Sequence, residues 1–312
     1  MAQPGPLSGI TIVDLSRILA GPYCTLLLAE LGARVIKVEA PKTGDDARQY
    51  GPFTNGKSTY FASVNRGKES IALDLKAPGD REIFERLLDK ADAVVENFRP
   101  GTMERLGYGW DSLHPRYPRL IYAAASGFGH TGPFSHYPSY DMVVQGLGGI
   151  MSITGNPGEP SPRIGASIGD LAGGLYTTIA LNAALLHRER TGEATKVDVA
   201  LFDCQLAILD TAIMSYTTTG DIPGPLGARH PSITPFEAFS TKDGNIIIAA
   251  GNDGLWGKLV QVLEHPELAE NPNYKTNPLR NQHQPQLKIE LDQILAAHTT
   301  DHWIAVLEKA GI

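Results

Sequence analysis

The chain has 312 residues, of which 42% are hydrophobic and 20% are charged, a composition typical of folded globular proteins. Its formal net charge of -7 argues against broad binding to nucleic acid or to an anionic membrane, whose phosphates attract basic surfaces. We therefore expect no nucleic-acid or membrane partner. At this length a single hydrophobic core is hard to sustain, so two domains are expected.

Cysteine usage and the N-terminus indicate the class of protein. Cys24 and Cys204 are the only cysteines, too few and too far apart for a disulfide framework or a four-ligand zinc site. Both lie in apolar helical patterns, so we interpret them as small core residues. Residues 1–6 lack a basic leader segment, and no apolar run is long enough to cross a bilayer. We expect a soluble, cytoplasmic protein with no metal.

The first part of the chain alternates short apolar runs with helical patterns, which is typical of a parallel sheet with helices on its faces. Strands are predicted at residues 10–13, 35–38, 70–75, 93–95, 120–125 and 196–200. Helices are predicted at residues 23–31, 80–90, 169–188 and 203–217. The turn after the first strand carries no Gly-x-Gly-x-x-Gly fingerprint, so the sequence gives no support for an ordinary dinucleotide site.

The second part begins with a stretch rich in Gly, Pro and Thr, the composition of a connection between domains. Beyond it we predict a strand, a turn, a second strand and three helices, at residues 236–239, 241–244, 245–250, 255–263, 288–297 and 301–309. The predicted fold is therefore an open, Rossmann-like α/β domain at residues 1–217, a linker at 218–235, and a smaller α+β domain at 236–312.

The loop at residues 126–149 is rich in glycine, proline and aromatic residues and follows a predicted buried strand. Asp141 starts the next predicted helix. Asp is a preferred N-cap residue, because its carboxylate accepts amide hydrogens of the first turn, and composition alone favours this role. An ionised carboxylate presented by a loop is also able to act as a nucleophile. Both roles stay open at this point.

Glycines and basic residues near this loop favour a ligand site. Glycines leave the backbone uncovered, so a ligand can approach closely and amides can face an oxyanion; here they are Gly127, Gly129, Gly132, Gly146, Gly148 and Gly149. Four basic residues lie at or just past the C-terminal ends of predicted strands, where open α/β sheets bind their ligands: Arg17, Lys76, Arg99 and Arg105. Taken singly, each basic residue is most simply a solvated surface charge.

Several long motifs in one order resemble the class III coenzyme A (CoA) transferases, the family of formyl-CoA:oxalate and carnitine CoA-transferases. One of them is Val-Asp-Leu-Ser-Arg-Ile-Leu-Ala-Gly-Pro at residues 13–22. The others lie at residues 31–39, 70–76, 95–101, 126–149, 196–203 and 229–253. The resemblance implies a two-domain subunit that interlocks with a second copy as a homodimer, and an aspartate nucleophile at Asp141.

The implied reaction moves CoA from a donor acyl-CoA, with a small or dicarboxylic acyl group, to a carboxylate acceptor. Asp141 attacks the donor thioester and forms a mixed anhydride with release of CoA thiolate. The thiolate then attacks the aspartyl carbonyl, which gives an aspartyl-CoA thioester and the free donor acid. The acceptor carboxylate reverses these steps. The resemblance implies CoA thioesters as substrates and no permanently bound cofactor.

By the same resemblance we expect the CoA-binding residues at or next to a defined set of positions. They are Arg17, Ala20, Leu73, Lys76, Asn97, Arg99, Arg105 and His130. His130 and His136 flank the glycine-rich loop, where a polar structural role is the simpler interpretation of each, although a His is also able to act as a general base.

Two alternatives to the transferase remain open. Related α-methylacyl-CoA racemases use an acidic residue near Asp170, which is otherwise interpreted as an N-cap, and carry a His where this chain has Tyr140. Tyr lacks a titration range near neutrality, so racemisation is the second hypothesis. The chain also ends at Ile312, where the family continues into the large domain, and residues 223–227 are only a weak counterpart of its glycine loop. An inactive, CoA-binding short form is the third hypothesis.

Overall fold

The computed structural model describes residues 5–312, which divide into two compact units. One unit contains residues 5–152 and 162–223, and the other contains residues 153–161 and 224–312. Residues 153–161 thus group with the second unit, whereas the sequence-based boundaries place them in the large domain. The assignment of a catalytic and a small domain stays a prediction. The start of the N-terminal segment, residues 1–4, lies outside the described residues.

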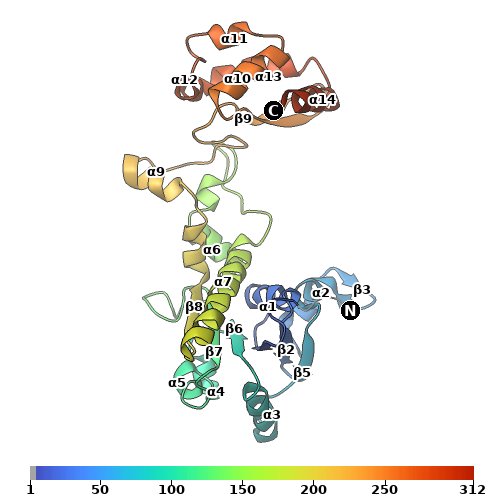
Figure 1. The fold of residues 1–312 in the computed structure, drawn as a ribbon, viewed down its shortest axis with the longest axis vertical. Coiled ribbons are helices and arrows are strands. Elements are labelled where there is room, and N and C mark those ends of the chain that lie inside the picture. Colours follow the sequence, from blue (N-terminus) through green and yellow to red (C-terminus); the bar gives the residue numbers. More distant parts are fainter. Residues whose placement is uncertain (1–4) are drawn as a thin grey trace. The chain divides into compact units, whose positions relative to one another are not determined.

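A six-stranded sheet organises the first unit (Figure 1). Its strands are β1 (Thr11–Asp14), β2 (Arg34–Glu39), β5 (Glu69–Ala72), β6 (Ala93–Glu96), β7 (Ile121–Ser126) and β8 (Lys196–Ala200). Their order is β5-β2-β1-β6-β7-β8, and all neighbours run parallel. Val13 of β1 pairs with Ile36 of β2 and Val94 of β6. The predicted α/β fold with a parallel sheet is confirmed.

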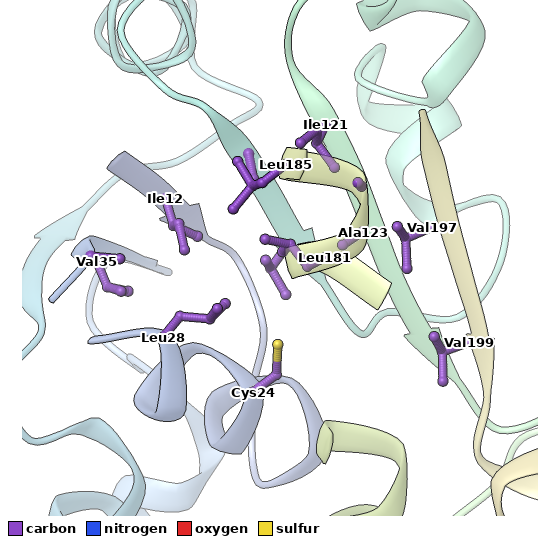
Figure 2. Packing of buried hydrophobic residues seen from close by; sticks show 14 of the residues in the cluster. Ile12, Cys24, Leu28, Val35, Ile121, Ala123, Leu181, Leu185, Val197 and Val199 are labelled. Carbon is purple, nitrogen blue, oxygen red and sulfur yellow. The ribbon is translucent and has the colours of Figure 1, made fainter. Parts of the chain in front are cut away.

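Apolar residues alternate between the two faces of this sheet because successive strand residues point in opposite directions. Ile12 packs on one face with α1 (Ala20–Glu30) and α7 (Ile168–Thr191), in a core that includes Leu28 and Leu181 (Figure 2). The neighbouring Val13 packs on the other face, together with Phe84. The helices of that second face are α3 (Pro78–Leu88), α4 (Thr102–Leu106) and α5 (Trp110–Leu113). Both sheet faces are therefore covered.

A glycine allows α1 and α7 to pack closely. A Cβ atom on Gly174 of α7 would lie 2.7 Å from the Ala20 carbonyl oxygen of α1. Real Cβ contacts are essentially never that short, so a larger residue would force the two helices apart. This close packing brings the N-terminal part of α7 next to the N-terminus of α1.

Smaller elements complete the first unit. They are η1 (Asp46–Gln49), β3 (Phe53–Thr54), β4 (Lys57–Ser58), α2 (Thr59–Asn65), α6 (Asp141–Leu147), α8 (Leu201–Ala207) and α9 (Ala212–Thr219). A further short helix, η2 (Met151–Ile153), spans the point where the chain passes from the first unit to the second. The single helix predicted at residues 203–217 was wrong: two helices replace it, and Asp210 between them has a φ of 53°. A left-handed residue cannot continue a right-handed helix. Cys24 and Cys204 are buried, as predicted.

The second unit is an α+β fold around a two-stranded antiparallel sheet, as predicted for this part of the chain. Its elements are β9 (Phe236–Ser240), β10 (Asn245–Ala249), α10 (Asp253–Val262), α11 (Glu267–Glu270), α12 (Asn277–Gln282), α13 (Gln284–Leu295) and α14 (Thr300–Ala310). Its core contains Trp256, Leu291 and Trp303. Within residues 5–312, no helix combines the length and apolar character needed to cross a bilayer.

Candidate functional site

A cavity of about 250 Å3 lies where the strand order of the parallel sheet reverses. From β1 the chain builds β2 and β5 on one side, then returns to β6 on the other side of β1. Open α/β sheets bind ligands outside the carboxyl ends of their strands at such a switch point. The cavity is lined by residues that follow β1, β6 and β7, among them Arg17, Ile18, Asn97, Arg99 and Gly127.

The structure gathers most of the predicted CoA-binding residues in two cavities. Arg17, Ala20, Asn97 and Arg99 line the first cavity. A second cavity of about 190 Å3 is lined by Leu73 and Lys76. Arg17 and Phe98 line both cavities, so the two lie side by side.

Two of the predicted CoA-binding residues, Arg105 and His130, line neither cavity. Arg105 donates a hydrogen bond to Thr102 Oγ1 at 2.8 Å. The His130 side chain is buried, with its Nδ1 3.2 Å from Lys196 Nζ and its Nε2 3.5 Å from Glu96 Oε1. Glu96 is buried as well and accepts the Phe98 amide at 2.7 Å. His130 thus contacts Glu96, which in turn binds the backbone of the cavity-lining Phe98.

Asp141 does not cap its own helix. The N-cap of α6 is Tyr140, and Asp141 is the first helical residue, so the predicted N-cap role was wrong. Its carboxylate instead reaches the N-terminus of α7, where Oδ1 accepts the amides of Gly169 at 2.8 Å and Asp170 at 3.4 Å. Oδ2 accepts a hydrogen bond from Gln145 Nε2 at 2.7 Å. The N-cap residue of α7 is Ser167, whose side chain forms no capping hydrogen bond. The Asp141 side chain therefore caps α7 in its place.

The absence of a side chain at Gly169 makes this contact possible. A Cβ atom there would lie 2.6 Å from Val144 Cγ2 and 3.1 Å from Asp141 Oδ1. The first contact is shorter than packed atoms tolerate, and the second would crowd the carboxylate that the Gly169 amide binds.

Asp170 lines the first cavity, as does Asp46, which pairs with Arg17 at 3.1 Å. Asp170 is the third residue of α7, so its predicted N-cap role was also wrong. Burial, and after it the neighbouring charge of Asp141, raises the pKa of Asp170 to about 7. A carboxyl group that lines a cavity and has a pKa near neutrality is a candidate for a functional acid or nucleophile.

Gln145 links these elements and was not identified from the sequence. Its side chain is fully buried, donates to Asp141, and accepts the Ile164 amide at 2.9 Å through Oε1. It therefore fixes the segment that leads into α7 as well as the Asp141 carboxylate. Its spacing of four residues from Asp141 on one helix was the only available signal.

Comparisons with known proteins agree with this geometry. The family model described as CoA-transferase family III matches residues 7–312. The acetyl-CoA:oxalate CoA-transferase of Acetobacter aceti is 46% identical, over 100% of this chain and 80% of that protein. The human succinyl-CoA:glutarate CoA-transferase is 39% identical, over 98% of this chain and 70% of that protein.

The fold is also similar to a solved structure, a CaiB/BaiF family protein from Brucella suis. That structure is 42% identical, with a TM-score of 0.88, over 99% of this chain and 83% of that chain. In the residues described here, no group of His, Cys and acidic side chains is placed to hold a metal ion. With the family model matched over nearly its whole length, the chain belongs to CoA-transferase family III.

Proposed function

We propose that the chain moves CoA from a dicarboxylic acyl-CoA thioester to a carboxylate acceptor. The observation that carries this proposal is the cavity at the switch point, which places Asp170 beside the basic side chains of Arg17 and Arg99. Relatives named for oxalate, glutarate and mesaconate support a dicarboxylic substrate class.

The sequence-based proposal places the nucleophile at Asp141, but the geometry favours Asp170. Asp170 lines the cavity, and Asp141 is not among the lining residues. Both carboxylate oxygens of Asp141 already accept N–H donors, which lowers their nucleophilicity. We therefore assign the nucleophile to Asp170 and a positioning role to Asp141, which holds the first turn of α7.

The proposed exchange proceeds through two covalent states of Asp170. Its carboxylate attacks the donor thioester carbonyl and expels CoA thiolate, which leaves a mixed anhydride of Asp170 and the donor acid. The thiolate attacks the Asp170 carbonyl, so the donor carboxylate leaves and an aspartyl-CoA thioester forms. The acceptor carboxylate attacks this thioester to form a second anhydride, and the expelled thiolate then attacks the acceptor acyl carbonyl. This last step frees Asp170.

The N-terminus of α1 is suited to stabilise the oxyanions that form in these steps. Ala20, its first residue, lines the cavity together with Asp170. No side chain caps this helix, so its first-turn amides have no side-chain acceptor. Free amides at the positive end of a helix dipole favour developing negative charge.

The two adjoining cavities are suited to CoA, which is long and carries phosphates at one end. The second cavity combines apolar lining residues such as Leu73 and Leu75 with the cation of Lys76. Arg17 lies between both cavities and also pairs with Asp46 at 3.1 Å. An apolar slot flanked by cations fits the adenine ring and phosphates, and the first cavity is left for the thioester end.

A homodimer is part of this proposal. Large apolar side chains of two helices are exposed on the isolated chain, including Met142 and Leu147 of α6 and Ile179 and Leu186 of α7, at 52% to 63%. An apolar surface of this kind is typical of an obligate interface. We also propose a cytoplasmic location, which suits a protein with two free, buried cysteines.

A coupled assay tests the proposed function. Dicarboxylic acyl-CoA donors are incubated with a panel of carboxylates, and formation of the new thioester is followed by mass spectrometry. Exchange of the α-proton for deuterium without an acceptor would instead support a racemase, although no His lines the first cavity. Binding of CoA without turnover over the whole panel would support the inactive short form.

A further inference from the structure

The segment Ser16–Arg17–Ile18, which follows β1, is held by side chains rather than by backbone partners. Asn97 Oδ1 accepts the Arg17 amide at 2.7 Å, and Asn97 Nδ2 donates to the Arg17 carbonyl at 2.7 Å. Lys37 Nζ donates to the Ser16 carbonyl at 2.6 Å. Asp45 Oδ1 accepts the Ile18 amide at 3.0 Å. Side chains from β2, from the loop after β6 and from the turn before η1 thus hydrogen-bond to the backbone of three consecutive residues.

Ile18 has an unfavourable backbone conformation inside this segment. Its φ is 69°, in the left-handed region that β-branched residues almost never adopt. Ile18 also lines the first cavity. Strain of this kind persists only where surrounding contacts impose it, and it concentrates at functional sites.

The contacts that impose it converge on one buried ion pair. Lys37 Nζ lies 2.9 Å from Asp45 Oδ2, and the two side chains are 1% and 0% exposed. Lys37 donates to the carbonyl of Ser16, and Asp45 accepts the amide of Ile18, so the pair binds the backbone on both sides of Arg17. Asp45 also caps η1 through the Ala47 amide, next to Asp46, which pairs with the Arg17 guanidinium.

A buried ion pair is a poor source of folding free energy, because the cost of removing both charges from water largely cancels their attraction. An apolar pair would fill the same space without that cost. What an apolar pair cannot do is donate to the Ser16 carbonyl and accept the Ile18 amide. The retained charges are therefore explained by the conformation of residues 16–18 rather than by stability.

We propose that Lys37 and Asp45 are positioning residues for CoA binding. They hold Ile18 in its left-handed conformation, so that the backbone of Ile18 shapes the first cavity and Arg17 stays between the two cavities. The inference rests on the proposed function, because it takes CoA as the ligand of those cavities.

A double-mutant cycle on CoA affinity tests this role. Calorimetry measures the dissociation constant of CoA for the full chain and for Lys37→Met, Ile18→Gly and the double variant. In the unsubstituted background Lys37→Met should weaken CoA binding about tenfold. Glycine adopts a positive φ without strain, so in the Ile18→Gly background the same change should weaken binding by about threefold or less.

Arg34→Met is the matched control. Arg34 lies on the same strand as Lys37 and forms an exposed ion pair with Glu69 at 2.7 Å. Its loss should leave CoA affinity unchanged. If Lys37→Met does not fold, Asp45→Asn replaces it in the cycle, because the amide keeps an acceptor for Ile18 while it removes the charge.

The outcomes separate the inference from the function on which it rests. Equal loss of affinity in both backgrounds, or no loss in folded Lys37→Met protein, would overturn the positioning role. An unsubstituted chain that binds no CoA would instead overturn the proposed function. If Ile18→Gly reduces the loss of CoA affinity caused by Lys37→Met, the ion pair acts through the conformation of Ile18. An ion pair with a purely structural role would not give this result.

Discussion

The Asp141 carboxylate accepts the Gly169 amide at 2.8 Å, one residue before the cavity-lining Asp170. The Asp141 side chain therefore holds the backbone at the start of α7, which carries Asp170. The charge of Asp141 also contributes to the raised pKa of Asp170, after burial. Two carboxyl groups in different environments commonly divide catalytic roles, and the predictions below separate them.

Substitution of Asp170 by Asn should abolish transfer and covalent trapping. The amide cannot form the anhydride, so transfer should fall by at least about 1000-fold. Incubation with acyl-CoA followed by hydroxylamine or borohydride should label Asp170 in the unsubstituted protein, as read by peptide mass spectrometry.

Asp141→Asn provides the comparison. Its amide oxygen still accepts the Gly169 amide, so we expect reduced turnover, about 10- to 100-fold, with the label retained at Asp170. A covalent label found at Asp141 would identify Asp141 as the nucleophile, as the sequence resemblance implies. Loss of labelling in Asp141→Asn but not in Asp170→Asn would lead to the same conclusion.

Activity should rise with pH through about 7, the raised pKa of Asp170. The nucleophile must be ionised, so the acidic limb of kcat/KM for the free enzyme should report this group. Asp141→Asn removes a negative charge that disfavours ionisation of Asp170, so the limb should move to lower pH. A limb that does not move in this variant would mean that another group controls it.

Much of this site could be predicted from the sequence. The parts that could not be predicted depend on contacts between residues that are distant in sequence. Strand and helix periodicity predicted the parallel sheet, and therefore placed Arg17 and Arg99 at strand ends that meet at one edge. The roles of Asp141 and Asp170 depend on which helix end each carboxyl reaches. Asp141 contacts a helix that begins 27 residues later, so the caps predicted from nearest neighbours in sequence were wrong.

The Ile18 conformation was also beyond sequence analysis. It is imposed by Lys37, Asp45 and Asn97, which are distant in sequence and oppose the local preference of a β-branched residue. His130 is a related case: the resemblance implies a CoA-binding position there, and its side chain is buried against Glu96 and Lys196, which are also distant in sequence.

Asp170→Asn should stabilise the folded chain above neutral pH. A carboxyl whose folded pKa is raised to about 7 binds a proton that the unfolded chain releases near 3.8, so stability falls as pH rises between these values. A neutral amide removes this cost, and we expect a gain of about 4 kcal/mol at pH 8 but less than about 1 kcal/mol at pH 4. Chemical denaturation at both pH values measures it, and an equal gain at the two would contradict the assignment.

Arg99→Gln should raise the KM for acyl-CoA about tenfold with little change in kcat. Its guanidinium is exposed at the first cavity and is positioned for an anionic ligand. A charge that binds substrate and transition state equally affects KM alone. Arg86→Gln, a loss of an exposed arginine on α3, is the control and should leave both constants unchanged. A fall in kcat with unchanged KM would place Arg99 in the chemical step instead.

Gly174→Ala should destabilise the first unit although alanine is the better helix former. Helix propensity favours alanine by about 1 kcal/mol, whereas overpacking costs about 1–3 kcal/mol. The new methyl would lie 2.7 Å from the Ala20 carbonyl oxygen, which is backbone and cannot rotate away. We expect a net loss of about 1 kcal/mol or more by chemical denaturation, with weaker CoA binding because the N-terminus of α1 is displaced. Gly79→Ala in α3, where a methyl meets nothing within 4 Å, should be neutral or stabilising, so a stabilised Gly174→Ala protein would show that the two helices separate without cost.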